Sequence, residues 1–522
     1  MLYKRVAIII IKIVLLQQFI GKLRKAVSGK NYTMNNAFVR NFLGSKQLAL
    51  EVAQRVQKTV PAYQKFLQKQ QANIEDIFEN LPPSDKETYA LAYPWKELLV
   101  DNYDECFCIN RSSGSSGQPF YWPQMRSENR SSPAGFKNFL EGAFAIHRKK
   151  TLAILGYSLG SWVGGDALSW VLKSIAIDTT YPFLVFSPGS NLDEIIEMIS
   201  TMESLIEQII VFIVPSAIPY LHLKASELQI SLPLDKIRYM VGSEPFPESL
   251  RASLQNRSGL GDKVSFMYSI YGSADTGTLG IESQATVTLR KILYRNHNLA
   301  TKLGFESPIP HFFHFLSKDT LLETIDGNLC VTRWQGIPLV RYIVYDRVSL
   351  YSWKELKQAV LNSEYLDSEN NQALVEILSN TSDQLPDLIA VTGRADKSVI
   401  LSGNNFTEYM LDAAIKSEEL DDILTGLYQA QVINQGDRQY LAIDLEIRQN
   451  VSPDRSVIDR VYYSLIQSLG KLQPSFLNYW QDIYSAWDND LQKRILRLNF
   501  VPCPTLSEKA KTSIKQRGII NN

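Results

Sequence analysis

The stretch between residues 151 and 243 alternates short apolar runs with an amphipathic segment, and this alternation limits the fold more than any other feature of the sequence. The apolar runs are TLAILGYS (151–158), PFLVF (182–186), IIVFIV (209–214) and IRYMVGS (237–243). Between two of them, NLDEIIEMISTMESLIEQ (191–208) carries its apolar residues at helical spacing. A strand, a helix and a further strand in this order predict a parallel sheet with crossover helices.

The sequence changes in character after about residue 350. A polar, acidic stretch at 362–387 is expected to separate the front of the chain from a tail. In the tail, QYLAIDLEI (439–447) alternates like a strand and SVIDRVYYSLIQSLGKL (456–472) has helical spacing. We therefore expect a large α/β body and a smaller α+β lid.

Charge and cysteine content narrow the class of protein. The 522 residues include 54 Lys and Arg and 54 Asp and Glu, so no net positive charge favours nucleic acid, and we expect no nucleic-acid partner. The four cysteines are Cys106, Cys108, Cys330 and Cys503, and they lack the paired spacing of a zinc site. They predict reduced thiols in a cytoplasmic protein.

The N-terminal segment, residues 1–33, is hydrophobic and basic. Its apolar run from Val6 to Leu16 is interrupted by Lys12 and is shorter than the roughly 20 residues that a membrane span needs. Three interpretations stay open: a peripheral anchor on an anionic membrane through residues 6–16, a buried first helix, or a true start at Met34.

A run of small residues lies between two apolar segments. The run is Ser112, Ser113, Gly114, Ser115, Ser116 and Gly117. Glycine lets successive backbone N–H groups face one side, and serine hydroxyls add donors, so such a loop can wrap an anion. The apolar segments CFCI and PFYW on either side argue against a flexible linker, and the position deep inside the chain argues against an expression scar.

A second pattern suggests different chemistry. Gly156-Tyr157-Ser158-Leu159-Gly160 follows a predicted strand, as the nucleophile elbow of an α/β-hydrolase does. The histidines downstream of Ser158, from which a catalytic base would come, are His222, His297, His311 and His314. Hydrolysis by Ser158 therefore stays an alternative.

Six segments, in order and covering about residues 106–517, resemble the motifs of the adenylate-forming superfamily. They are SSGSSGQP (112–119), VGSEPFPESLR (241–251), YSIYGSADTG (268–277), GNLCVTRWQGIPLVRYIVYD (327–346), VTGRADKSVILSGNNF (391–406) and LSEKAKTSIKQR (506–517). Details of the fourth and sixth segments resemble the motifs of the phenylacetate–CoA ligase-like branch of this superfamily, which includes CapK-type proteins. The resemblance implies an α/β fold with mixed and parallel sheets in a large adenylate-forming domain (34–392), and a smaller, mobile α+β C-terminal lid (393–522).

The resemblance also implies a role for each matching residue. Ser112 to Gly117 would hold the phosphates of ATP. Ser243, Glu244 and Pro245 would line adenine, Tyr271 would stack on it, and Gly272 would also contact the nucleotide. Asp346 would accept hydrogen bonds from both ribose hydroxyls, and Arg341 and Arg394 would reach ribose or phosphate. Tyr157, Trp162 and Gly164 would line the acyl pocket.

The remaining implied roles concern the metal and the lid. Asp275 would bind Mg²⁺. Lys509 would be the catalytic lysine that bridges the substrate carboxylate and the α-phosphate, with Lys511 as a fallback. The lid would turn about a hinge at Asp396 or Lys397 and bring in the loop around Gly403. The chain departs from the family pattern at four positions: Gln118 (usually Lys), Ala274 (usually Thr or Ser), Asp275 (usually Glu) and Glu508 (usually Gly).

The reaction implied is ATP- and Mg²⁺-dependent conversion of a carboxylic acid to an acyl-adenylate with release of pyrophosphate, followed by acyl transfer to a thiol, first of all that of coenzyme A. Three alternatives stay open: transfer to a carrier protein, an amine or a sugar; a ligase fold without catalysis; and hydrolysis by Ser158. The sequence does not name the acid, and it leaves open a homodimer and a membrane-associated form of the cytoplasmic protein.

Overall fold

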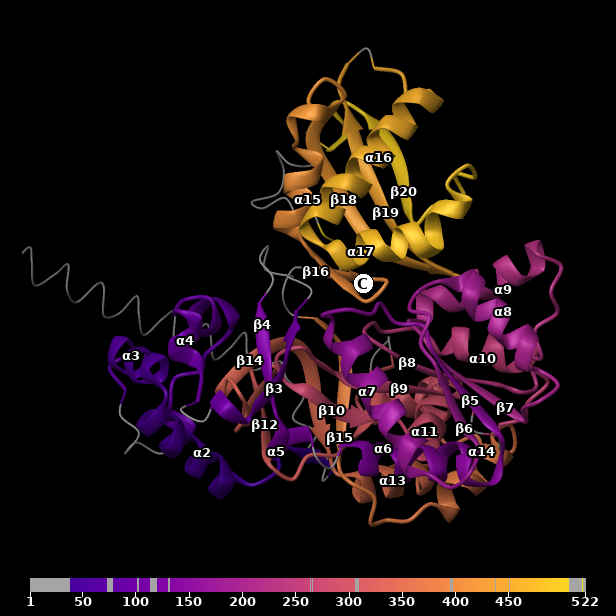
Figure 1. The fold of residues 1–522 in the computed structure, drawn as a ribbon. Helices are drawn as coiled ribbons and strands as arrows, with labels where there is room; N and C mark the ends of the chain where they lie inside the picture. The colour runs from indigo at the N-terminus through magenta and orange to yellow at the C-terminus, as the bar shows by residue number, and fades with distance from the viewer. Residues whose placement is uncertain are drawn as a thin grey trace, which may run out of the picture.

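The computed structural model describes residues 38–72, 78–100, 103–112, 120–129, 132–262, 264, 266–305, 309–394, 398–436, 438–449, 451–506 and 519. Figure 1 shows a large body below and a smaller lid, drawn in orange and yellow, above it. None of the helices in these ranges is long and apolar enough to cross a membrane. The apolar run from Val6 to Leu16 lies outside the described residues.

Parallel strands with crossover helices form one half of the body, as the alternation predicts. The strands are β5 (Thr151–Leu155), β6 (Phe183–Phe186), β7 (Gln208–Phe212), β8 (Ile237–Gly242) and β9 (Met267–Ser273), and the helices are α7 (Val163–Asp178), α8 (Leu192–Met202), α9 (Ile218–Glu227) and α10 (Glu248–Arg257). The strands lie in the order β6-β5-β7-β8-β9, each parallel to its neighbours. All residues of β5, β7 and β8 are buried, because helices cover parallel sheets on both faces.

The same sheet continues beyond β9 with antiparallel strands. They follow in the order β10 (Gly277–Ile281), β11 (His311–Phe315), β15 (Leu388–Arg394), β14 (Leu339–Tyr351), β13 (Asn328–Arg333), β12 (Thr320–Ile325) and β2 (Phe42–Leu43), and β1 (Val39–Arg40) pairs with β14. The acidic stretch at 362–387 does not separate body from tail, contrary to expectation. It forms α14 (Gln372–Asn380), which buries Leu374 and Leu378 and packs on α11 (Gln284–Arg295).

Helices and a hairpin from the N-terminal part complete the body. They are α2 (Lys46–Thr59), α3 (Pro61–Lys69), the one-turn π-helix η2 (Lys86–Ala90), and the hairpin of β3 (Cys106–Arg111) and β4 (Tyr121–Met125). The residues before η2 are joined to β14, because Ser84 N–H donates to Arg341 O (3.0 Å) and Ile343 N–H donates to Ser84 O (2.8 Å).

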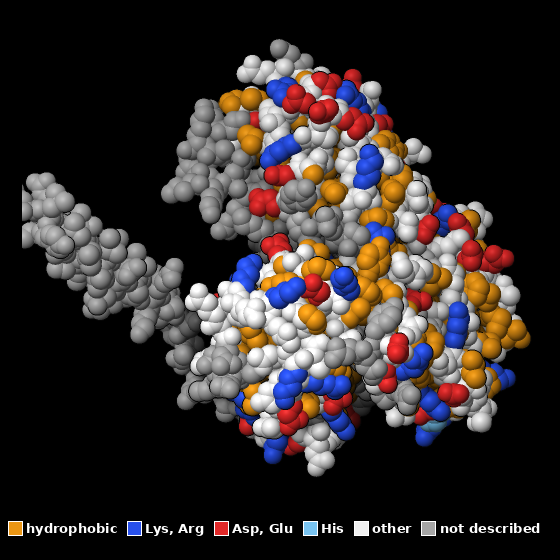
Figure 2. Space-filling model, turned by 60° about the vertical axis from the view of Figure 1, so that its left-hand side comes forward, with side chains coloured by type: hydrophobic (Ala, Val, Ile, Leu, Met, Phe, Trp, Pro, Cys, Tyr) orange, Lys and Arg blue, Asp and Glu red, His pale blue; other side chains and the backbone are white. Residues whose placement is uncertain are grey.

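The lid is a separate α+β unit, as expected. Its elements are β16 (Ser398–Leu401), β17 (Asn404–Thr407), α15 (Glu408–Ile415), β18 (Leu424–Gln435), β19 (Arg438–Ile447), α16 (Arg455–Leu472), α17 (Pro474–Tyr479), the one-turn helices η7 (Trp480–Tyr484) and η8 (Ser485–Trp487), and β20 (Leu496–Pro502). The strands β18, β19 and β20 form one sheet. Acidic and basic side chains are interspersed over body and lid on the face in Figure 2.

A buried cluster of charges lies between α10, α11 and the centre of the sheet. Glu282 accepts hydrogen bonds from Arg251 Nη2 (2.6 Å) and Ser269 N (2.9 Å), and His311 Nδ1 lies 3.3 Å from it. Arg290 Nη2 donates to the carbonyl of Phe246 (3.0 Å). The cationic neighbours outweigh burial at Glu282 and hold its pKa at about 2, whereas burial lowers the pKa of His311 to about 4.

These two shifts predict that the protein loses stability in acid. Both groups bind protons more weakly in the native state than when unfolded, so their stabilisation is full above their unfolded pKa values and is lost as pH falls. The His311 contribution falls between pH 6.5 and about 4, and that of Glu282 between 4.5 and about 2. Urea midpoints of wild type and His311→Gln, measured from pH 7 to 4, should show a shallower decline in the variant.

The exposed His147 offers the matched control, and His147→Gln should follow the wild-type curve. Parallel curves for wild type and His311→Gln would contradict the assignment.

Candidate functional site

Several of the residues singled out in the sequence lie on the central strands of the sheet or directly after them. β8 and β9 are parallel neighbours, so the segments that follow Gly242 and Ser273 leave the same edge of the sheet. In β14 and β15, Asp346 pairs with Arg394. Ligands of open α/β sheets bind beyond the carboxyl ends of the strands, so this edge is the candidate site.

Asp346 is the centre of the site. Its Oδ2 accepts a hydrogen bond from Tyr271 Oη (2.6 Å), and its Oδ1 accepts one from Arg394 Nη1 (2.9 Å). Burial, followed by the charge of Asp346, raises the pKa of Tyr271 well above its usual value, so the phenol stays a donor. The Tyr271 ring stacks on Phe313 with centroids 5.2 Å apart. A side chain at Gly272 would place its Cβ 2.2 Å from Gly277 O, so only glycine fits beside the stacked ring.

Asp275 occupies the turn after β9. Its Oδ2 accepts a hydrogen bond from Tyr342 Oη (2.7 Å), and its backbone carbonyl accepts one from Gln335 Nε2 (2.7 Å). No group of three or more His, Cys, Asp or Glu in the described ranges forms a metal cluster. A nucleotide-bound Mg²⁺ needs only one or two protein carboxylates, so Asp275 fits this ion and its role stays a prediction. Ala274 packs against the hydrophobic cluster around β12–β14.

The first residue of the Ser/Gly run closes the β3–β4 hairpin. Ser112 is buried, and its N–H donates to Phe120 O (2.9 Å). Its Oγ accepts from Phe120 N (3.1 Å) and from Lys86 Nζ (3.3 Å). Ser112 and Phe120, which flank residues 113–119, are therefore joined to each other. Ser113, Gly114, Ser115, Ser116 and Gly117 lie outside the described residues.

Glu244 joins the body to the lid. Its carboxylate accepts from the backbone N–H of Ser216 in the body (2.6 Å) and of Gly403 in the lid (2.9 Å). Burial raises the pKa of Glu244, although these donors oppose the shift. Neighbouring Ser243 and Pro245 are exposed. A Cβ at Gly403 would lie 2.9 Å from Ser243 Cβ, so glycine permits the close approach.

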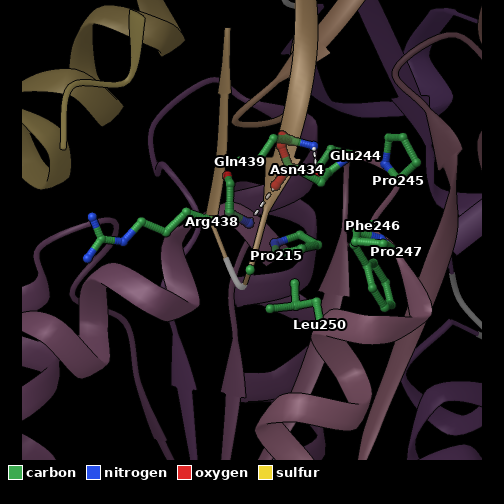
Figure 3. Close-up of a pocket in the computed structure, with 11 residues that line it drawn as sticks. Pro215, Glu244, Pro245, Phe246, Pro247, Leu250, Asn434, Arg438 and Gln439 are labelled. Carbon is green, nitrogen blue, oxygen red and sulfur yellow. Dashed lines mark hydrogen bonds between the residues drawn. The ribbon is translucent and has the colours of Figure 1, made fainter. Parts of the chain in front are cut away.

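A cavity of about 10 Å³ lies at this seam, and Figure 3 shows residues that line it. Glu244, Pro245, Phe246 and Pro247 line it from the body, while Asn434 and Gln439 come from the hairpin of β18 and β19 in the lid. The tip of the lid hairpin therefore lies against the segment expected to line adenine.

Aromatic residues of the lid extend the seam. The Tyr484 hydroxyl hydrogen-bonds Ser402 Oγ (2.6 Å) and Ser216 Oγ (3.3 Å). Tyr479 Oη accepts from Ser158 N (3.4 Å). Ser190 of the body also donates to Asp482 of the lid, so the segment after α16 holds the lid on the body.

The three residues expected in the acyl pocket have different surroundings. Tyr157 is buried near the end of β8, and burial raises its pKa well above the usual value. The centroid of the Trp162 ring lies 5.1 Å from Cζ of Arg111 in β3. Gly164 is exposed, and a Cβ there would meet nothing within 4 Å. Their role in acyl binding stays a prediction.

Arg341 lies apart from Asp346 and Arg394. Its guanidinium is 3.4 Å from Glu323 and donates to the carbonyls of Glu79 and Leu81, so the structure does not bring it into the Asp346 cluster. Asp396, Lys397, Lys509 and Lys511 lie outside the described residues, and their assignments stay predictions.

Ser158 has no histidine partner in the described part of the chain. The three histidines for which hydrogen bonds are seen have other partners: His222 meets Tyr239, His311 meets Glu282, and His314 meets Pro386 and Ser283. The Ser158 hydroxyl lies buried beneath the lid, near Tyr479. Among the described residues, no histidine is therefore placed to act as the base for a Ser158 nucleophile.

Sequence reasoning missed three residues that the fold brings to the site. They are Lys86, which reaches Ser112, and the lid residues Tyr479 and Tyr484. Tyr479 and Tyr484 lie in a stretch that no motif marks, and Lys86 belongs to a charged segment, SDKETY (84–89), that is typical of a surface. Only their long-range contacts identify them.

Comparison with solved structures shows the fold. The chain is similar to a 2-hydroxyisobutyryl-CoA ligase in complex with 2-HIB-AMP and CoA in the thioesterification state, with a TM-score of 0.56, 12% identity, and coverage of 91% of this chain and 88% of that chain. Weaker similarity extends to a GH3.15 acyl acid amido synthetase, with a TM-score of 0.40, 13% identity and 91% coverage of both chains. No family model and no curated protein matches the sequence.

The chain therefore has the mixed α/β, two-domain fold of adenylate-forming enzymes. The fold class implied by the six motifs is confirmed.

The contacts at the seam predict that the phenol of Tyr484 helps to hold the lid on the body. Tyr484→Phe removes two hydrogen bonds, each of about 1 kcal/mol, and leaves Ser216 and Ser402 without this partner. Amide hydrogen exchange over residues 398–407 should accelerate about fivefold or more, the rate change that about 1 kcal/mol produces.

Tyr463 is an exposed tyrosine on α16 of the same lid, so Tyr463→Phe is the matched control and should leave that exchange unchanged. Equal exchange in wild type and Tyr484→Phe would refute the role of the phenol.

Proposed function

We propose that this protein activates a carboxylic acid with ATP and then transfers the acyl group to a thiol, that of coenzyme A. The observation that carries the proposal is the cluster of Asp346 in β14, Tyr271 near the end of β9 and Arg394 at the end of β15, with Asp275 in the turn that follows β9. The six ordered motifs and the two-domain fold support it.

The first step forms the acyl-adenylate. A carboxylate oxygen attacks the α-phosphorus, the bond from that phosphorus to the bridging oxygen breaks, and pyrophosphate leaves with the electron pair. Asp346 would accept the ribose hydroxyls, and its partners Tyr271 and Arg394 hold it in place. Asp275 would hold Mg²⁺, which supplies positive charge beside the phosphates. Lys509 would donate to the substrate carboxylate and the α-phosphate.

The second step uses the seam between body and lid. A thiolate attacks the acyl carbon, and AMP leaves with the electron pair of the broken C–O bond. Gly403 lies against Ser243 and Glu244, so the lid loop of the proposed thiol path reaches the adenine segment. Tight packing there would keep water from the adenylate.

The direct test is release of pyrophosphate from ATP across a panel of carboxylic acids. At least one acid should raise the release above the background without acid, and Lys509→Ala should abolish the increase. Mass spectrometry of reactions with CoA or a carrier protein then identifies the acceptor. If no acid raises the release and Lys509→Ala changes nothing, the chain is not such a ligase.

The ribose assignment predicts a loss of nucleotide affinity in Asp346→Asn. Charge-assisted hydrogen bonds contribute about 1.5–3 kcal/mol each, so the Kd for ATP should rise about tenfold or more. Isothermal titration calorimetry measures the effect, with Asp319→Asn on the exposed turn before β12 as the control. Unchanged affinity in a folded Asp346→Asn protein would remove Asp346 from the nucleotide site.

A further inference from the structure

Lys86 brings a positive charge to the candidate site from a part of the chain that no motif covers. It is the first residue of η2, and its Nζ donates a hydrogen bond to Ser112 Oγ (3.3 Å). Ser112 opens the Ser/Gly run, so the ammonium lies at the entrance of the loop expected to hold phosphates.

The backbone before Lys86 is held firmly against β14. Ser84 exchanges backbone hydrogen bonds with Arg341 and Ile343, and its Oγ donates to Val340 O (3.1 Å). Asp85 caps η2 through Thr88 N (2.7 Å) and accepts from Tyr345 Oη (2.5 Å). Lys86 is therefore anchored to the strand that carries Asp346, one residue beyond Tyr345.

The charged groups that act on Lys86 belong to the candidate site. Burial lowers the pKa of Lys86, the carboxylate of Asp275 raises it, and the guanidinium of Arg394 lowers it again. The ammonium thus lies within electrostatic reach of both the candidate metal ligand and the partner of Asp346. It can donate three hydrogen bonds, and within the described ranges it donates one, to Ser112.

We propose that Lys86 binds the β- and γ-phosphates of ATP and the pyrophosphate that leaves. The inference rests on the proposed function and assigns to Lys86 the cation that the resembling loops carry where this chain has Gln118. Negative charge accumulates on the bridging oxygen as the bond to the α-phosphorus breaks, and a fixed ammonium stabilises that charge.

The surroundings of Lys86 favour an anionic ligand. A half-buried ammonium near Arg394 loses hydration and meets a like charge, both of which disfavour its charged form. A polyphosphate would relieve both effects, because it supplies acceptor oxygens and opposite charge. AMP has no β- or γ-phosphate and would not reach this ammonium.

Calorimetric titration of the full chain with inorganic pyrophosphate, ATP and AMP tests the proposal. Lys86→Ala should weaken binding of pyrophosphate and of ATP about tenfold or more, the loss expected for a charge-assisted hydrogen bond, and should leave AMP binding within about twofold. Lys86→Arg should recover a large part of the loss. The exposed Lys96 is the matched control, and Lys96→Ala should bind all three ligands like wild type.

The outcomes separate this inference from the proposed function. An equal loss of ATP and AMP binding in Lys86→Ala would make Lys86 a structural residue, and no loss at all would remove it from the site. Either result overturns the inference while the proposed function stands. A wild-type protein that binds none of the three ligands would overturn both.

Discussion

Burial of the Glu282 carboxylate is the constraint on which the candidate site depends. Glu282 is fully buried, and a buried charge is tolerated only when donors and counter-charges surround it. Its donors come from α10 and β9, and His311 of β11 lies 3.3 Å from it, so one side chain contacts a helix and two strands and fixes them relative to one another. Arg290 extends the network to the carbonyl of Phe246, two residues after Glu244. The buried charge cluster thereby sets the position of residues 244–246, the segment that meets the lid.

The site above this core is arranged as alternating charges. Asp346 lies against Arg394, and Lys86 lies within reach of both Arg394 and Asp275. Each carboxylate also accepts from a tyrosine, Tyr271 for Asp346 and Tyr342 for Asp275. These phenols fix the carboxylates without neutralising them, so the site presents two acidic and two basic groups in fixed positions. A nucleotide with its metal carries the complementary pattern of hydroxyls, phosphates and cation.

Much of the fold follows from the sequence, because periodicity reports burial directly. The runs at 151–158, 182–186, 209–214 and 237–243 became β5 to β8, and 456–472 became α16 with nearly the predicted bounds. The acidic stretch at 362–387 misled, since Leu374 and Leu378 make one apolar face inside a polar segment. The average composition of the stretch does not reveal such a face, because the polar residues around it outnumber the two leucines.

The parts of the site that the sequence did not reveal depend on contacts between distant segments. Lys86 meets Ser112 only because η2 is bound to β14, more than 250 residues later in the chain. Tyr484 meets Ser216 across a similar separation. Local patterns cannot report such pairs. The motif resemblance singled out Asp346, Tyr271 and Arg394, whose side chains the structure brings together, and their role in nucleotide binding stays a prediction. It also grouped Arg341 with them, whereas the Arg341 side chain lies with Glu323.

The chemical make-up of the seam affects how freely lid and body can part. Its polar contacts are hydrogen bonds of phenols, serines, backbone amides and a carboxylate, and water can replace each of these partners. Its apolar contacts include the ring of Tyr220 in the body, whose centroid lies 4.8 Å from that of Tyr484 and 5.0 Å from that of Trp487 in the lid. Exchange of such bonds with water changes the free energy by only about 1 kcal/mol each, whereas exposing an apolar seam costs about 25 cal/mol for every Å². Separating the lid from the body would therefore exchange the polar contacts at a small cost and expose the aromatic rings at a larger one, so the rings contribute most to keeping this seam closed.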